Sequence, residues 1–251
     1  MTIMVTGGTR GLGKAIAARL TSAGHDVVVV GRDRSAPLVA DLSRLSEVRR
    51  VAKEVGSVDV LINNAGVSKA RRELTEDGLE TTFAVNHMAP FVLSNLLLPR
   101  KVITVASEQH RFATAIPWDD LQGERRFRQL EQYSLTKLYN ILFTRELARR
   151  TRDRGMLVNC LSPGFLRTDL GREAAGTFKV FLALAGPFRR PPEVGAEAVS
   201  HVLETNTTGA YFRGMKEAAP SMLAQDDAAA ARMWDVSWKL GAHALEAAKL
   251  G

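Results

Sequence analysis

Four consecutive valines, residues 27–30, lie between Asp26 and Gly31, and this run constrains the fold more than any other feature of the chain. An uninterrupted β-branched run is typical of a strand covered on both faces, as strands are in parallel sheets. Short apolar runs of this kind alternate with segments of helical periodicity. The expected strands are Ile3–Val5, Asp26–Gly31, Val39–Ala40, Val58–Ile62, Lys101–Ala106, Met156–Leu161 and Ala210–Phe212, and the expected helices are Lys14–Ala23, Glu47–Val55, Phe83–Leu98 and Tyr133–Arg150. The alternation predicts an α/β fold, a doubly wound parallel sheet of about seven strands with helices on both faces.

The organisation of the chain predicts one domain over residues 1–251, because no internal repeat or low-complexity linker interrupts the alternation. Two connections are unusually short. The segment between Gly31 and Val39 leaves no room for a regular crossover helix, and the helix ending near Leu98 runs almost directly into the strand that starts at Lys101. We expect a trimmed edge of the sheet at these places.

Composition and charge argue against several classes of protein. The net charge is +7, but the basic residues are scattered and only 6% of residues are aromatic, so a nucleic-acid groove is not expected. The single cysteine, Cys160, reads as an inert core thiol, and no Cys/His cluster has metal-binding spacing. No apolar stretch is long enough to cross a bilayer, and no signal peptide precedes the first strand. We therefore expect a soluble, cytoplasmic protein without a metal site.

A glycine-rich turn, Thr6–Gly13, separates the first expected strand from the first expected helix. Backbone N–H groups at a helix N-terminus bind phosphate oxygens, and glycines let a pyrophosphate approach the backbone closely. Gly7, Gly11 and Gly13 follow the spacing G-x-x-x-G-x-G. A plain tight loop is the alternative, but the position at the first strand–helix turn favours a phosphate site.

At this point the chain resembles the short-chain dehydrogenase/reductase family. The resemblance continues through Asn63–Gly66, Asn86, Ser107, Tyr133–Lys137 and the pair Pro163 and Gly164, in order, over nearly the whole chain. Within that family the segments 75–78, 85–87, 142–148 and 220–234 are most similar to the retinol-dehydrogenase-like reductases. The resemblance implies a Rossmann fold and a nicotinamide-dependent oxidoreductase.

The resemblance implies catalytic roles for Asn86, Ser107, Tyr133 and Lys137. Tyr133 and Lys137 are one helical turn apart, so their side chains share a face, and a nearby ammonium is expected to lower the pKa of the phenol. Tyr133 would exchange a proton with the substrate oxygen, Lys137 would also bind the nicotinamide ribose, Ser107 would orient the substrate, and Asn86 would hold a water that links Lys137 to solvent. A chance surface pair, a turn serine and a helix-kinking core amide are the alternatives.

Two histidines lie beside these residues. His87 is expected to be structural, and His110, three residues after Ser107, is a candidate for the wall of the substrate entrance.

The predicted cofactor is NADP(H), because Arg32 follows the second strand and Arg10 lies in the glycine-rich turn. Two guanidinium groups suit a 2′-phosphate, whereas Asp33 leaves NAD(H) open. Cofactor contacts are expected from Gly7, Thr9, Arg10, Gly11, Leu12, Gly13, Arg32, Asp41, Leu42, Asn64, Ala65, Gly66, Tyr133, Lys137, Pro163, Gly164, Leu166 and Thr168.

The expected reaction is hydride transfer between NADP(H) and a hydrophobic ketone or aldehyde, or the corresponding alcohol. An apolar segment around residues 170–192 is a candidate cover for the substrate, with a packed surface helix as the alternative. A non-catalytic dinucleotide-binding regulator and an epimerase or dehydratase with transient redox chemistry remain alternative functions. Relatives often pair through the helices that begin near Phe83 and Tyr133, so a homodimer or homotetramer is compatible with the resemblance.

Overall fold

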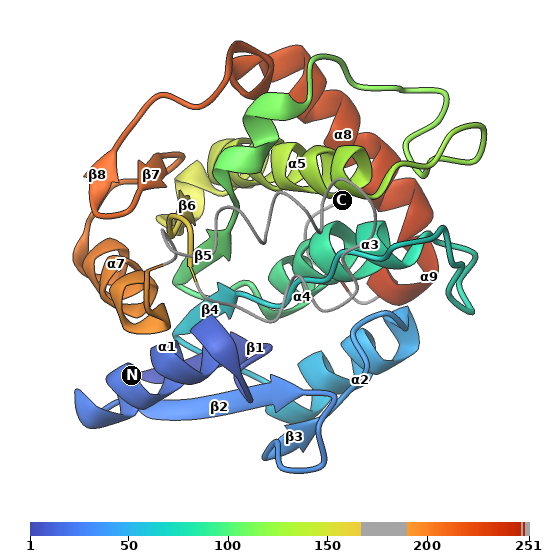
Figure 1. The fold of residues 1–251 in the computed structure, drawn as a ribbon. Coiled ribbons are helices and arrows are strands. Elements are labelled where there is room, and N and C mark those ends of the chain that lie inside the picture. The colour runs from blue at the N-terminus through green and yellow to red at the C-terminus, as the bar shows by residue number, and fades with distance from the viewer. Residues whose placement is uncertain (167–189, 247, 249–251) are drawn as a thin grey trace.

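The computed structural model describes residues 1–166, 190–246 and 248, and these residues form one eight-stranded sheet (Figure 1). The strand order is β3-β2-β1-β4-β5-β6-β7-β8, and every neighbouring pair is parallel except β7 and β8. The strands are β1 (Thr2–Thr6), β2 (Asp26–Gly31), β3 (Leu38–Val39), β4 (Val60–Asn63), β5 (Lys101–Val105), β6 (Leu157–Ser162), β7 (Tyr211–Arg213) and β8 (Lys216–Glu217). The chain runs outward from β1 in one direction and restarts at β4 in the other, so a crevice opens at the carboxyl ends of these two strands.

Helices cover both faces of this sheet. The α-helices are α1 (Gly11–Ser22), α2 (Leu45–Val55), α3 (Thr81–Phe83), α4 (Ala89–Leu97), α5 (Gln129–Arg150), α7 (Pro192–Glu204), α8 (Asp227–Leu240) and α9 (Ala242–Leu245). A π-helix, η1 (Ala84–Met88), joins α3 to α4, and the 3-10 helices are η2 (Glu108–Phe112), η3 (Arg152–Arg154) and η6 (Met222–Gln225). None of the helices in the described residues is long and apolar enough to cross a membrane.

The two cores follow from the alternation of side chains along each strand. Ile3 and Val5 of β1 pack with α1 and α7, whereas Met4 between them packs with α2, α4 and α5 on the opposite face. Successive side chains of a strand point to opposite faces, so an uninterrupted apolar strand supplies both cores at once. This confirms the expected doubly wound sheet with helices on both faces.

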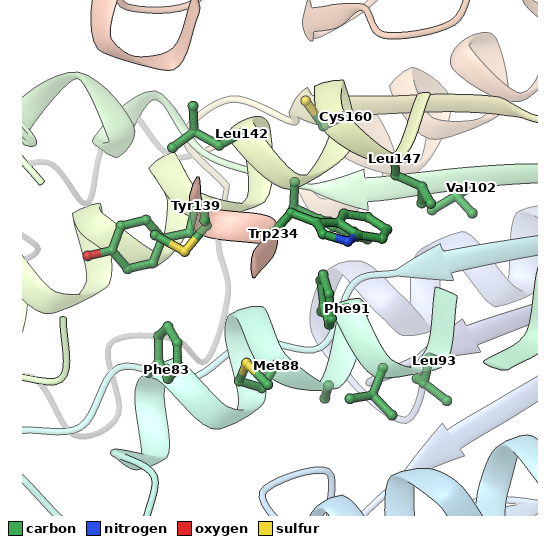
Figure 2. Close-up of a cluster of buried hydrophobic side chains, with 14 of the residues drawn as sticks. Phe83, Met88, Phe91, Leu93, Val102, Tyr139, Leu142, Leu147, Cys160 and Trp234 are labelled. Atoms are coloured by element: carbon green, nitrogen blue, oxygen red, sulfur yellow. The ribbon is translucent and has the colours of Figure 1, made fainter. Parts of the chain in front are cut away.

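Helix α8 packs against α5, and its Trp234 lies in the buried cluster with Phe91 of α4 (Figure 2). The ring of Trp234 lies 4.9 Å from that of Phe91 on α4 and stacks 6.3 Å from that of Phe143 on α5, measured between centroids. Aromatic pairs at these separations add to the free energy gained from burial alone. The helices through which relatives are expected to pair are therefore covered, at this surface, by the chain itself.

The structure corrects several expectations about individual elements. An eighth strand, β8, pairs antiparallel with β7 after a turn at Gly214, and only the two residues Lys216 and Glu217 form it. Helices α7 and α8 lie in segments for which no helix was predicted. The single helix expected over Phe83–Leu98 is interrupted by the π-helical turn η1.

The expectation of a trimmed edge is confirmed at one connection and wrong at the other. The short segment after β2 leads to β3, a two-residue strand at the edge of the sheet. The short segment before β5 lies in the middle of the sheet. Leu98 ends α4 in the left-handed region, with φ 42°, which turns the chain within a few residues. The turn therefore shortens the connection without shortening the sheet.

Candidate active site

A pocket of about 650 Å³ opens at the carboxyl ends of the parallel strands. Most of the residues predicted for a cofactor or substrate line it together: Gly7, Thr9, Arg10, Gly11, Leu12, Gly13, Arg32, Asp41, Leu42, Asn64, Ala65, Gly66, Ser107, Tyr133, Lys137, Pro163, Gly164 and Leu166. Asn86 lies behind the wall, while Thr168 and most of the segment 170–192 fall outside the described residues. Residues from distant parts of the chain thus converge on one cavity.

The glycine-rich turn is shaped by contacts that exclude larger side chains. A Cβ atom on Gly13 would lie 2.1 Å from the carbonyl oxygen of Gly7, so a side chain at this position would require the backbone to move. Gly11 has φ +51°, and a Cβ there would meet nothing within 4 Å. The N-cap residue of α1, Arg10, makes no side-chain capping hydrogen bond to the described residues, and the first residues of the helix line the pocket. This is the geometry of an anion site.

The segment that follows β4 is hydrogen-bonded to the glycine-rich turn. The side-chain amide nitrogen of Asn64 donates to the carbonyl oxygens of Thr6 (2.8 Å) and Gly7 (3.3 Å), while the Thr6 hydroxyl accepts from the backbone N–H groups of Asn64 and Ala65. Asn64 therefore lines the pocket and also braces the loop, a structural role that the sequence did not indicate.

Tyr133, Lys137 and Ser107 meet at the inner end of the pocket. Tyr133 and Lys137 are 5% and 3% exposed on α5, and the Ser107 hydroxyl, which accepts the Gln109 N–H at 3.2 Å, lines the same pocket. The Lys137 ammonium donates to the Val105 carbonyl oxygen at 2.9 Å and lies 5.5 Å from the centroid of the Tyr133 ring. The predicted shared face is confirmed, and it points into the pocket.

The electrostatics of this group correct the expected effect of the ammonium on the phenol. Burial raises the pKa of Tyr133 above its ordinary value, and the nearby Ser107 hydroxyl offsets this only in part. Burial also lowers the pKa of Lys137 to about 8. The ammonium points to the Val105 carbonyl rather than to the phenol oxygen, so desolvation dominates. The Tyr133 phenol therefore keeps its proton at neutral pH.

Asn86 is held inside the π-helical turn behind this group. Its side-chain oxygen accepts from the Val67 N–H at 2.8 Å, and its amide nitrogen donates to the Val67 carbonyl at 2.9 Å and to the Thr136 hydroxyl at 3.0 Å. A Cβ on Gly66 would lie 3.5 Å from the Asn86 oxygen and 3.6 Å from the Lys137 nitrogen. Asn86 and Lys137 therefore flank one point beside Gly66, and Thr136 fixes which end of the amide faces it.

Both neighbouring histidines are structural. His87 is fully buried, its Nε2 lies 2.7 Å from the Ser237 hydroxyl oxygen on α8, and burial lowers its pKa to about 4. His110 is also fully buried, so its predicted place in the substrate entrance is wrong. Its Nε2 accepts the Ser221 N–H at 3.1 Å, so the proton lies on Nδ1, which donates to the Ser107 carbonyl oxygen at 2.7 Å. His110 thus ties the chain at Ser107 to the segment before η6.

The other end of the pocket is basic. Arg10 and Arg32 line it together with Asp41 and Leu42. The carboxylate of Asp33, in contrast, accepts the Ser35 N–H at 2.9 Å, and Asp33 is not among the described residues that line the pocket. The hydrogen bond from Ser35 lowers the pKa of Asp33. The Asp41 carboxylate accepts the Ser43 N–H at 3.0 Å, which fixes the turn after β3.

Several pocket residues were missed by sequence reasoning. Glu108 and Gln109 follow Ser107, Phe165 follows Gly164, and Ser162 and Arg213 are the last residues of β6 and β7. Their position at the carboxyl ends of parallel strands was the available signal, because that edge carries ligand contacts in doubly wound folds. Arg213 was missed mainly because the strand was predicted over Ala210–Phe212, one residue before the observed β7.

Comparisons with known proteins agree with this geometry. The profile of the short chain dehydrogenase family matches residues 1–47 and 37–177. The chain is 35% identical to retinol dehydrogenase 13 of Mus musculus, over 95% of this chain and 83% of that protein. It is 33% identical to retinol dehydrogenase 14 of Homo sapiens, over 94% and 84% respectively.

Solved structures show the same fold. An uncharacterised protein from Mycobacterium paratuberculosis is 31% identical with a TM-score of 0.79, over 96% of this chain and 93% of that one. A short chain dehydrogenase from Burkholderia cenocepacia in complex with NADP is 25% identical with a TM-score of 0.66, over 84% and 94%.

The buried ammonium yields a prediction about stability. The fall of the Lys137 pKa from 10.5 to about 8 corresponds to about 3 kcal/mol that opposes folding below pH 8. Between pH 8 and 10.5 the unfolded chain binds the extra proton, so this penalty disappears as the pH rises. We expect Lys137→Met to raise the free energy of unfolding at pH 7 by about 2 kcal/mol, after loss of the hydrogen bond to Val105.

The measurement is urea unfolding at pH 7, 8, 9 and 10, and the gain of the variant over the parent chain should shrink along the series. Lys53→Met is the control, because Lys53 is exposed on α2 and no burial penalty is removed there. A Lys137→Met chain that is less stable at pH 7, with a difference that does not change with pH, would contradict the assignment.

Proposed function

The chain belongs to the short-chain dehydrogenase family, and from that premise we propose that it transfers a hydride between NADP(H) and a hydrophobic ketone or aldehyde, or the corresponding alcohol. One observation carries the proposal. The Tyr133 phenol, the Ser107 hydroxyl and the Lys137 ammonium converge in the same pocket as the N-terminal residues of α1. A proton donor and a phosphate site in one cavity suit a reductase that uses a dinucleotide.

The residues present fit such a cofactor. The open space beside Gly11 and the first N–H groups of α1 would hold the pyrophosphate, as helix N-termini hold anions. Asp41 and Leu42 would contact the adenine, Asn64–Gly66 the adenine-side ribose, Lys137 the nicotinamide ribose, and Pro163, Gly164 and Leu166 the carboxamide side. A bound nicotinamide would supply or accept the hydride.

The chain's own residues would handle the proton and the orientation of the substrate. Tyr133 keeps its proton at neutral pH because burial raises its pKa, so it would donate that proton to the carbonyl oxygen during reduction. The Ser107 hydroxyl would hold the same oxygen and stabilise negative charge as it develops. Asn86 and Lys137 flank the point beside Gly66 where a relayed proton would enter.

The preference for NADP(H) is supported by the basic end of the pocket. Arg10 and Arg32 line it, whereas the Asp33 carboxylate is engaged by Ser35 in its own loop. Two guanidinium groups suit a 2′-phosphate, which they can bind bidentately. A 25% identical neighbour, a blue fluorescent protein from a metagenomic library, is solved in complex with NADPH.

The first test is reduction of a panel of hydrophobic ketones and aldehydes with NADPH and NADH as alternative donors. We expect turnover that prefers NADPH and falls about a thousandfold in Tyr133→Phe, because the acid is lost while the ring is kept. Unchanged nucleotide binding and melting temperature would show that the variant is intact. Tight NADPH binding without reduction of any carbonyl would favour a regulator or a transient-redox enzyme instead.

A second test concerns the cofactor. In the double variant Arg10→Ala, Arg32→Ala we expect the KM for NADPH to rise about a hundredfold, because two charge-assisted contacts are lost, with the KM for NADH within twofold. Arg34→Ala is the matched control, since Arg34 is exposed nearby and is not among the described residues of the pocket. An equal rise for both nucleotides would argue against a 2′-phosphate site.

A third test concerns the orientation of Asn86. Thr136→Val keeps the shape of the side chain but leaves a buried amide hydrogen of Asn86 unpaired, so we expect kcat to fall about tenfold with little change in the KM for the carbonyl. Thr136→Ser should restore the rate. Thr144→Val, at a buried position eight residues further along α5, is the control and should keep it. Equal losses in the two valine variants would point to general packing damage.

A further inference from the structure

The wall of the pocket beyond Ser107 carries charged residues that the reaction described above does not use. Glu108 and Gln109 begin η2, and Arg213 ends β7. Arg213 is paired in register with Ser162 of β6, another pocket residue, so its backbone lies at the same edge of the sheet as the reacting groups. Figure 1 shows β6 and β7 side by side at this end of the molecule.

The Glu108 carboxylate is fixed by three partners from two segments of chain. One oxygen accepts a short hydrogen bond from the buried Tyr211 hydroxyl. The other accepts from Arg111 at 3.2 Å and forms an ion pair with Arg213 at 3.8 Å. Two guanidinium groups therefore surround one carboxylate, and the cluster carries one excess positive charge.

The guanidinium group of Arg213 contacts Glu108 on its Nε side only. Its two terminal nitrogens have no partner among the described residues. The side chain is 70% exposed and lines the pocket. A guanidinium group with both terminal nitrogens free presents the planar pair of donors that matches a carboxylate.

The lining of the pocket also includes the apolar side chains of Val67, Val85 and Phe165, together with polar residues such as Ser68, Lys69 and Thr81. A pocket with apolar side chains in its lining and an open guanidinium group suits a ligand with an apolar body and an anionic end. A neutral hydrocarbon would leave the free donors of Arg213 unused, although it would still be compatible with the apolar part.

We propose that Arg213 binds a carboxylate of the substrate, so that the substrate class is a carbonyl compound, or its alcohol, with an apolar body and a carboxylate at its far end. Glu108 acts as a positioning residue that orients the guanidinium. This inference deepens the proposed function and rests on it for the identity of the reacting group. The anion site itself can be tested without turnover.

The experiment compares matched ligands on the holoenzyme. Calorimetry with NADP⁺ present measures the binding of decanoate and of decanol, and initial rates are measured for ω-oxo acids of six to twelve carbons and for their methyl esters. We expect Arg213→Leu to weaken decanoate about tenfold and leave decanol within twofold, since one exposed charge-assisted pair is lost. The preference for acids over esters should disappear in the same variant.

Arg100→Leu is the control, because Arg100 is exposed, lies outside the Glu108 cluster and is not among the described residues that line the pocket. It should retain both preferences. Arg213→Lys, which keeps the charge without the paired donors, should recover only part of the decanoate binding.

The outcomes separate the two proposals. Equal affinities of the parent chain and Arg213→Leu for decanoate would overturn the anion site, because Arg213 would then be a surface arginine that does not bind the carboxylate. Equal rates for acids and esters in the parent chain would overturn the substrate class while leaving the reductase standing. Loss of decanoate binding in Arg213→Leu, with no carbonyl reduced by any chain, would support the anion site and overturn the proposed function.

Discussion

The Lys137 ammonium is the constraint around which the site is organised. A charge buried to this degree opposes folding, and the hydrogen bond to the Val105 carbonyl at the end of β5 offsets only part of that cost. That contact fixes α5 against the sheet and places Tyr133, one turn earlier, beside Ser107. The π-helical turn then brings Asn86 to the other side of the ammonium, next to Gly66. Burial of these side chains also raises the pKa of Tyr133, so the phenol stays protonated.

The parts of this arrangement that depend on regular periodicity could be predicted from the sequence. Strands β1 and β4–β6 are covered on both faces and the valines of β2 are mostly half-buried, so their apolar runs were informative, and the residues at their carboxyl ends reached one pocket as expected. Helix α8 was missed although Trp234 and its neighbours are buried, and β8 is too short to leave a pattern. The spacing of Tyr133 and Lys137 predicted that they share one face of the helix. It could not predict that the ammonium donates to the Val105 carbonyl of β5 rather than to the phenol oxygen. For this reason the direction of the phenol's pKa shift was predicted wrongly.

The pocket has two basic ends of different construction. Arg10 and Arg32 lie on loops beside the start of α1, where the helix dipole already favours an anion. Arg213 lies at the end of a strand and is braced by Glu108, which is itself held by Tyr211. At the end with Arg10 and Arg32, the backbone at the start of α1 contributes to the attraction for an anion. At the end with Arg213, only side chains contribute, so substitutions there can alter the charge without disturbing the fold.

The hydrogen bond between His110 and Ser221 has a consequence for the order in which the protein becomes competent during synthesis. The loop that carries Ser107 is complete early, but its carbonyl is held by a histidine whose other nitrogen needs the N–H of residue 221. Helix α8, which covers α5, comes later still. A nascent chain can form the nucleotide-facing half of the sheet while the ribosome is still adding these residues. The Ser107 side of the pocket is therefore completed only after Ser221 and α8 have been synthesised, so the order of synthesis delays the completion of this side of the site.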